Sequence, residues 1–312
     1  MTSTILIAAE LRDLLPADPV PGHAVEWISA DQPLPSGDHY VAIVPLLSRW
    51  IGGQQLKQLL GLKIVANCAV GVDNVDLVSC QMGKVRVTNT PGVLTESTAD
   101  LTWSLILQVA RRTKEGERLV AGGAWTGWHP TQLLGLELDG ATLGLVGAGR
   151  IGQAVGRRAM GFGLRLLYAA RSRKDDFEAA TGAKRVDLPR LLAQSDIVTL
   201  HTPSTPETKG FINRERLAQM KDGAILINTA RGDLVREPAL LEALESGRLA
   251  GAGLDVFPEE PSVHPALVAH PRVVCLPHLG SATVKTRTAM AQLAVANVNA
   301  VLSGGVALTP VF

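Results

Sequence analysis

The sequence has little of several features that mark particular classes of protein. Aromatic residues make up 4% of the 312 residues, and 30 basic residues nearly balance 29 acidic ones, leaving a net charge of +1. Such a balance gives no charge excess of the kind that favours nucleic acid or a membrane surface. The longest apolar stretch, 99–110, is too short to span a bilayer and contains Asp100. We therefore expect no nucleic-acid partner and no membrane segment.

Cysteine is also scarce, because the chain has only Cys68, Cys80 and Cys275. The three are odd in number, scattered, and without the spacing of metal ligands, so we expect reduced thiols and no metal site. Residues 1–13 lack the basic start and long apolar core of a signal peptide. These features together predict a cytoplasmic protein.

What the sequence does contain is an alternation of short apolar strands and helices, which indicates the α/β class. The length suggests two domains, and 46% hydrophobic residues can fill their cores. Five prolines between residues 16 and 35 predict a loop-rich region. One long helix is expected from Thr95 to about Val120, and another from Ser281 to Leu302. Strands are expected at 5–8, 40–44, 62–66, 85–88, 142–146, 164–169, 197–200, 224–227, 252–256 and 273–276.

A glycine motif follows the strand at 142–146. Gly147, Gly149 and Gly152 have G-x-G-x-x-G spacing, and apolar residues then recur at helical spacing before the next strand. In this strand–turn–helix–strand context, the first glycine allows a tight turn and the second allows close approach of a pyrophosphate. The third lets the helix pack on the strand, and the phosphates lie at the helix N-terminus. The motif predicts a dinucleotide-binding fold.

The end of the following strand indicates which dinucleotide is preferred. NAD sites usually carry an acidic residue there for the ribose 2′-hydroxyl, but Ala170 occupies that place. Arg171, Ser172 and Arg173 come next and suit a 2′-phosphate, which an acidic residue would repel. We predict that NADP(H) is preferred and that NAD(H) is possible, the alternative being a solvated basic loop.

Three polar residues with complementary chemistry each follow a different expected strand. They are Arg231, Glu260 and His278, and ligands of an open α/β sheet bind beyond the carboxyl ends of its strands. Reduction of a 2-keto acid leaves an alkoxide that needs a proton, which a histidine supplies near neutral pH. A carboxylate orients the imidazole, and an arginine binds a substrate carboxylate. This trio predicts an active site for hydride transfer.

These residues lie in blocks that resemble the D-isomer-specific 2-hydroxyacid dehydrogenases. The blocks are 146–152, 195–213, 224–235, 251–261 and 277–283, with weaker likeness at 62–76 and 95–112. The resemblance implies two Rossmann-like doubly wound parallel-sheet domains with a cleft between them. It places a discontinuous substrate-binding domain at 1–97 plus 284–312 and a dinucleotide-binding domain at 98–283. It also implies a homodimer.

The resemblance assigns further roles residue by residue. Arg231, Glu260 and His278 match the catalytic trio, and backbone N–H groups of Val70 and Gly71 match a loop that binds the substrate carboxylate. Leu47 lies in a substrate loop, and Trp128 matches a tryptophan that reaches the partner's active site, the alternative being interface packing alone. Besides the glycines and the basic run, the residues implied at the cofactor are Thr98, Arg150, Ile151, Thr202, Pro203, Thr229, Ala230, Asp255 and Gly280.

Within the family, the glyoxylate/hydroxypyruvate reductase branch resembles this chain most, through 46–48 and 171–173. Glu260 argues against formate as substrate, since formate dehydrogenases have glutamine there, and Val70 argues against phosphite. Arg49 departs from the expected acidic residue, so it either faces solvent or meets a second negative charge, which keeps a D-3-phosphoglycerate dehydrogenase-like activity open. A dinucleotide-sensing binding protein is the non-enzymatic alternative. The exact keto acid is left open, because packing alone selects it.

Overall fold

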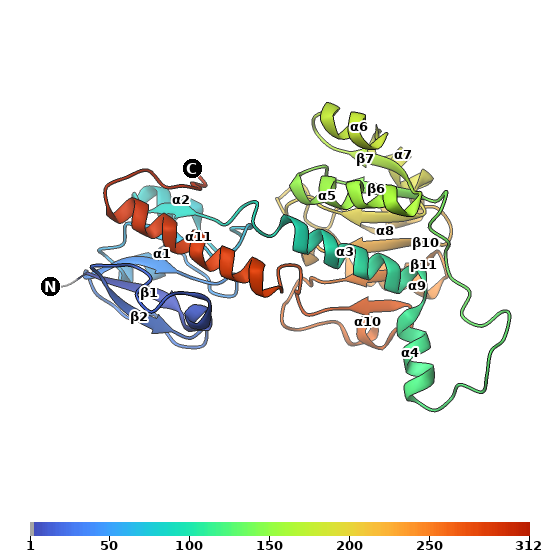
Figure 1. Cartoon of the computed structure of the whole chain (residues 1–312), viewed down its shortest axis with the longest axis horizontal. Helices are drawn as coiled ribbons and strands as arrows, with labels where there is room; N and C mark the ends of the chain where they lie inside the picture. Colours follow the sequence, from blue (N-terminus) through green and yellow to red (C-terminus); the bar gives the residue numbers. More distant parts are fainter. Residues whose placement is uncertain (1–2) are drawn as a thin grey trace. The chain divides into compact units, whose positions relative to one another are not determined.

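The computed structural model describes residues 3–312, and they form two compact units (Figure 1). The first unit runs to Leu94 and resumes from Ala282 to Phe312, and the second runs from Thr95 to Ser281. Each unit has its own parallel sheet with helices on both faces, so the expected α/β class with two doubly wound sheets is confirmed. No helix within residues 3–312 is long and apolar enough to cross a membrane.

The sheet of the first unit has the strand order β2-β1-β3-β4-β5, and all of its pairings are parallel. Apolar side chains of η1 and α11 cover one face, and those of α1 and α2 cover the other. The strands are β1 Thr4–Ala8, β2 Ala24–Ile28, β3 Tyr40–Val44, β4 Ile64–Ala66 and β5 Arg86–Thr88. The helices are η1 Ala9–Leu14, α1 Gly53–Gln58, α2 Leu77–Met82 and α11 Val284–Leu302.

Two expectations for this unit need correction. The proline-rich region contains a strand, β2, which pairs in parallel with β1 at the sheet edge. Only Ile28 of this strand is buried, so its apolar pattern is too weak to see in the sequence. The last helix begins at Val284 rather than Ser281, because the Thr283 hydroxyl accepts a hydrogen bond from the Thr286 N–H and caps it there.

The second unit has a seven-stranded parallel sheet with the order β12-β11-β10-β9-β6-β7-β8. Because the chain winds outward from β6 in both directions, the topological switch point lies between β6 and β9, where such folds bind ligands. Helices α3 and α5 cover one face, and α7, α8 and α9 cover the other. The strands are β6 Thr142–Val146, β7 Arg165–Ala169, β8 Lys184–Arg185, β9 Ile197–Leu200, β10 Ala224–Asn228, β11 Leu249–Leu254 and β12 Val273–Cys275.

The expected long helix after Thr95 is two helices, α3 Thr95–Ala110 and α4 Thr113–Ala121. Arg112 has a left-handed backbone with φ of 54° and breaks the run without glycine or proline. Its guanidinium bonds Glu115 at 2.8 Å. Helix α3 buries its apolar side chains in the core, whereas α4 buries none. Tertiary packing therefore ends the first helix, and α4 with the loop after it projects from the unit (Figure 1).

The remaining helices of this unit are short and connect successive strands. They are α5 Arg150–Ala159, η2 Met160–Phe162, α6 Asp175–Thr181, α7 Leu188–Gln194, α8 Arg214–Gln219, η3 Gly232–Leu234, α9 Glu237–Glu245 and α10 Pro265–Ala269. Phe162 lies in η2 and stacks on Trp103 with ring centroids 4.4 Å apart.

Candidate active site

The glycine turn between β6 and α5 has a different steric demand at each glycine. Gly147 has a φ of +100°, and a Cβ there would lie 2.5 Å from the His201 carbonyl oxygen. A Cβ at Gly152 would lie 2.2 Å from the Gly147 carbonyl oxygen, so the helix packs on the turn through this glycine. Gly149 is the N-cap of α5 with no side-chain cap, and a Cβ there would meet nothing within 4 Å. The open space before an uncapped N-terminus fits a dinucleotide pyrophosphate. Arg150 and Ile151 form the first turn of this helix.

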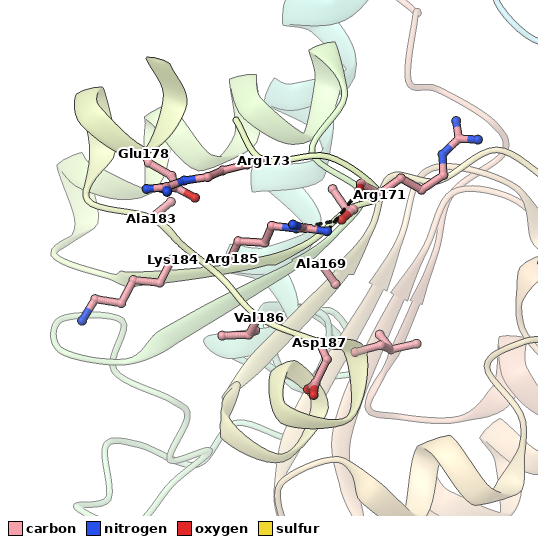
Figure 2. Close-up of a pocket in the computed structure, with 11 residues that line it drawn as sticks. Ala169, Arg171, Arg173, Glu178, Ala183, Lys184, Arg185, Val186 and Asp187 are labelled. Atoms are coloured by element: carbon pink, nitrogen blue, oxygen red, sulfur yellow. Dashed lines mark hydrogen bonds and ion pairs between the residues drawn. The ribbon is translucent and has the colours of Figure 1, made fainter. Parts of the chain in front are cut away.

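The basic residues after β7 line a pocket of about 860 Å³, shown in Figure 2. Arg171 is exposed and extends away from the other labelled side chains. Arg173 instead pairs with Asp175 at 3.0 Å and with Glu178 at 2.7 Å. The Ser172 hydroxyl accepts a hydrogen bond from Lys174. Three residues were expected at a 2′-phosphate. Arg173 is paired with carboxylates, whereas none of the described ion pairs contains Arg171.

Arg185, in β8, is a pocket residue that the sequence reasoning missed. Its guanidinium donates to the carbonyl oxygens of Ala170 and Arg171, at 3.0 Å in each case (Figure 2). It therefore holds the backbone from which Arg171 extends. A strand of two residues has no periodicity, so no pattern in the sequence could place Arg185 at this turn.

Glu260 and His278 form a hydrogen-bonded pair. The imidazole Nδ1 donates to the carboxylate Oε2 at 2.8 Å, and the other carboxylate oxygen accepts from the Phe257 N–H at 2.9 Å. Glu260 follows β11 and His278 follows β12, and these strands are neighbours in the sheet. The pair is about 30% exposed, with 31% for His278 and 29% for Glu260. Nε2 of the imidazole is left to face a ligand.

The electrostatics around Glu260 keep it ionised. Burial by itself would raise its pKa, but the bonds from His278 and the Phe257 N–H and the positive charge of Arg231 lower the pKa below its ordinary value. Arg231 follows β10, the next strand of the sheet, and its Nη1 donates to the Ala230 carbonyl oxygen. Buried Asn228 shapes this turn, because its amide donates to the Arg231 carbonyl and accepts from the Ala230 N–H. The second unit thus brings the predicted trio to one sheet edge.

Asp255 supports the turn that carries His278. It is 1% exposed and accepts hydrogen bonds from the N–H groups of Leu279 at 2.7 Å and Gly280 at 2.9 Å. Burial raises the pKa of Asp255 to about 6, although these bonds and the charge of His278 oppose the shift. His278 itself has a left-handed φ of 54°, and its N–H donates to the Asp255 carbonyl. His278 is therefore fixed by hydrogen bonds of both its backbone N–H and its imidazole.

The other residues expected at the cofactor lie in the same unit. The hydroxyl of buried Thr98 donates to the Gly280 carbonyl, and Thr229 bonds Thr102 at 2.8 Å. Thr202 and Pro203 directly follow β9, beside the switch point. Trp128 lies on the loop after α4 and is 82% exposed.

Three residues expected at the substrate lie in two loops of the first unit. Val70 and Gly71 are partly exposed in the loop after β4, and Leu47 is 46% exposed in the loop after β3. Arg49 donates to the carbonyl oxygens of Gln32 and Ser29. Arg49 is nevertheless partly exposed, and carbonyl oxygens do not neutralise its charge, so both predictions for Arg49, a solvent-facing side chain or a contact to a second negative charge, stay predictions.

The cysteines form no disulfide among the described residues. Burial raises the pKa of Cys68 to about 12 and that of Cys80 to about 11, so both stay protonated at neutral pH. No group of three or more His, Cys, Asp or Glu side chains within residues 3–312 has an arrangement that would hold a metal ion.

Comparison with known proteins agrees with this fold. Residues 103–280 match the family described as D-isomer specific 2-hydroxyacid dehydrogenase, NAD binding domain. The glyoxylate reductase of Thermococcus onnurineus is 48% identical over 269 residues, covering 85% of this chain and 80% of that protein. An NADPH-dependent glyoxylate/hydroxypyruvate reductase of Sinorhizobium meliloti, solved with NADP and malonate, is 35% identical with a TM-score of 0.88, covering 100% of this chain and 97% of that one.

A glyoxylate reductase of Paecilomyes thermophila is also similar in structure, with 30% identity, a TM-score of 0.85, and coverage of 99% and 98%. The family match and these relatives define a nicotinamide-dinucleotide-dependent oxidoreductase. The chain belongs to the D-isomer specific 2-hydroxyacid dehydrogenase family, as the sequence blocks predicted. The non-enzymatic alternative of a dinucleotide-sensing protein finds no counterpart among these relatives.

Proposed function

We propose that the protein reduces a small 2-keto acid, glyoxylate or hydroxypyruvate, to the D-2-hydroxy acid and prefers NADPH. The observation that carries this proposal is the 2.8 Å pair of His278 and Glu260 beside Arg231 at the ends of three adjacent strands. The relatives named glyoxylate reductase favour the substrate class. A D-3-phosphoglycerate dehydrogenase-like activity is the weaker alternative, because the relatives reported above are named glyoxylate reductase.

Each member of the trio has one role in this proposal. The nicotinamide, when bound, supplies the hydride. His278 donates a proton from Nε2 to the oxygen of the reduced carbonyl, and Glu260 orients the ring through Nδ1 and stabilises its charged form. Arg231 binds the substrate carboxylate in a charged fork and polarises the carbonyl. In the first unit, backbone N–H groups of Val70 and Gly71 bind a substrate carboxylate in this proposal, and Leu47 contacts the third substituent.

The geometry of the second unit supports the proposed cofactor contacts. Pyrophosphate would be held at Gly147, Gly149, Arg150, Ile151 and Gly152, where the N-terminus of α5 is open. Thr202, Pro203, Thr229, Ala230, Asp255, Gly280 and Thr98 line the path to the nicotinamide. Arg171 contacts the 2′-phosphate, with Ser172 beside it, whereas Arg173 acts through its pairing with Glu178.

We further infer a homodimer in the cytoplasm, in which the loop carrying Trp128 packs on the partner. A tryptophan that is 82% exposed on a projecting loop favours burial against another chain. The substrate-binding role therefore belongs to the first unit together with Trp128 of the partner subunit. Deleting the indole by Trp128→Ala should convert dimers to monomers or raise the KM for keto acid. If it does neither, both roles of Trp128 are wrong.

The deciding experiment measures oxidation of NADPH and NADH by the purified protein with glyoxylate, hydroxypyruvate, pyruvate and phosphohydroxypyruvate. Fast NADPH-dependent turnover of the first two supports the proposal. Arg171→Ala should raise the KM for NADPH roughly ten- to a hundredfold and leave that for NADH nearly unchanged, because a lost charge-assisted bond costs about 1.5–3 kcal/mol. Lys184→Ala, a neighbouring cation of the same pocket, is the matched control. An equal effect of Arg171→Ala on both cofactors would remove the 2′-phosphate assignment.

A further inference from the structure

Three loops of the first unit are linked by asparagine side chains. They follow β3, β4 and β5, which are adjacent in the sheet. Asn67 follows β4 directly and is fully buried. Its amide donates to the Gly71 carbonyl at 2.8 Å and exchanges two 3.0 Å bonds with Asn74. Asn89, which follows β5, donates to the Val70 carbonyl at 2.7 Å.

These bonds, with one from the backbone, anchor three successive carbonyls. The Ala69 oxygen accepts from the Thr90 N–H at 2.9 Å, the Val70 oxygen from Asn89, and the Gly71 oxygen from Asn67. In a trans peptide the C=O and the following N–H point in opposite directions. Each anchored carbonyl therefore turns the next N–H, at residues 70, 71 and 72, away from its anchor.

The N–H groups so presented are unused within the described part of this unit. No hydrogen bond of residues 3–94 and 282–312 involves the N–H of Val70, Gly71 or Val72, and all three residues are partly exposed. Successive backbone donors that have no partner within their own unit are available to an anion.

Asn74 connects this segment to a second loop. Besides bonding Asn67, its amide donates to the carbonyl oxygens of Leu46 at 3.2 Å and Arg49 at 3.1 Å. These two carbonyls flank Leu47 and Ser48, so the backbone of the loop that carries Leu47 is held by the same amide pair. A shift of Asn74 would move the Leu47 side chain relative to residues 70–72.

We propose that Asn67, Asn74 and Asn89 are positioning residues that build a three-donor carboxylate site from the N–H groups of residues 70–72. Asn89 presents the N–H of Gly71, and Asn67 presents that of Val72, a third donor beyond the two implied by the family resemblance. Asn74 sets the place of Leu47 and with it the selection of the third substituent of the keto acid. The functional part of this inference rests on the proposed function.

The test compares Asn67→Ala, Asn89→Ala and Asn74→Ala with Asn299→Ala, a partly buried asparagine of the same unit whose amide donates to the Pro19 carbonyl. At saturating NADPH, Asn67→Ala and Asn89→Ala should raise the KM for glyoxylate and hydroxypyruvate alike, by about tenfold, since one oriented bond to an anion is lost. The kcat and the KM for NADPH should stay within about twofold, which a general loss of structure would not allow. Asn74→Ala should change the ratio of the two keto-acid KM values.

Binding of oxamate, a 2-keto acid analogue that cannot be reduced, separates this inference from the proposed function. Its dissociation constant, measured calorimetrically with NADPH present, should rise in the asparagine variants whether or not the wild type turns over keto acids. Wild-type protein without turnover but with asparagine-dependent oxamate binding would refute the function and keep the inference. Folded variants that bind oxamate and keto acids like Asn299→Ala would overturn it. If Asn67→Ala does not fold, Asn89→Ala, at a partly exposed position, decides the question.

Discussion

The ligand-facing edges of the two sheets are built from different chemistry. In the first unit, neutral amides of Asn67, Asn74 and Asn89 hold backbone so that N–H groups are presented. In the second unit, the edge carries ionised side chains, with Glu260 bonded to His278 and Asp255 beneath the turn. The difference teaches that two sheets of the same class can end in different chemistry. The loops of the first unit are held by neutral amides, and those of the second carry an acid–imidazole pair.

Both edges nevertheless use the same local device. A buried asparagine or aspartate stands at or just after the end of a strand and ties down the backbone of the next turn. Asn67 does so after β4, Asn228 at the end of β10 and Asp255 after β11. A short polar side chain at this place satisfies backbone groups that a loop would otherwise leave unpaired. In the first unit this arrangement fixes the backbone at Gly71. In the second unit it fixes the turns that carry Arg231 and His278.

The largest expected effect is that of removing His278, the proposed proton donor. His278→Ala should lower kcat by roughly 10² to 10⁴, the usual contribution of a positioned acid, with the KM for NADPH nearly unchanged. His270→Ala is the matched control, because His270 precedes β12 and His278 follows it at the opposite end. Steady-state kinetics decide the matter. Retained turnover in His278→Ala would show that the ionised edge does not carry the chemistry.

Loss of the carboxylate partner should be a smaller effect with a pH signature. Because the pKa of Glu260 lies below its ordinary value, the wild-type carboxylate is charged at neutral pH. A charged carboxylate beside an imidazole favours the protonated form of the ring. Glu260→Gln should lower kcat roughly ten- to a hundredfold and move the alkaline fall of the reduction rate to lower pH. The neighbouring exposed Glu259→Gln should change neither quantity. A pH–rate profile with an unmoved alkaline limb would contradict the orienting role.

Gly149 and Gly152 lie at the N-terminus of α5. Substituting each of them separates an effect on stability from an effect on cofactor binding. Gly152→Ala should destabilise the protein by about 1–3 kcal/mol, because its methyl would meet the Gly147 carbonyl at 2.2 Å. Gly149→Ala should keep the Tm, since its methyl meets no protein atom within 4 Å, yet raise the KM for NADPH about tenfold. Thermal unfolding and cofactor kinetics check both. Unchanged cofactor affinity in Gly149→Ala would move the pyrophosphate elsewhere.

Substituting His201, beside the glycine turn, should have the smallest effect on the protein at neutral pH. Burial lowers its pKa from 6.5 to about 3, so the folded protein keeps the ring neutral while the unfolded chain takes up a proton below pH 6.5. Stability should therefore fall by about 2 kcal/mol between pH 7 and pH 5 on account of this residue. Denaturant unfolding of His201→Gln should show a flatter dependence, with His39→Gln as control. Equal slopes for wild type and His201→Gln would mean that the ring is charged or solvated.

The sequence by itself determined the class of fold and the place of the trio. Apolar runs such as 142–146 and 197–200 became strands with those bounds, because buried parallel strands need continuous apolar residues. The glycine spacing predicted the turn at Gly147, and the polar residues after successive strands predicted a shared edge. These are local or topological properties, and each leaves a pattern within a short stretch of chain.

Only the tertiary structure decided the features that depend on distant partners. Packing or a nearby charge overrides local preference at three places. They are the helix break at Arg112, the edge strand β2 and the pairing of Arg173 with Glu178. The backbone contacts of Arg49 and Arg185 join residues 14 to 20 apart in sequence. The asparagine network spans as many as 28 residues, from Leu46 to Asn74. An amide carries no sign of its acceptor in the sequence, because hydrogen-bond partners are chosen by proximity in the folded chain.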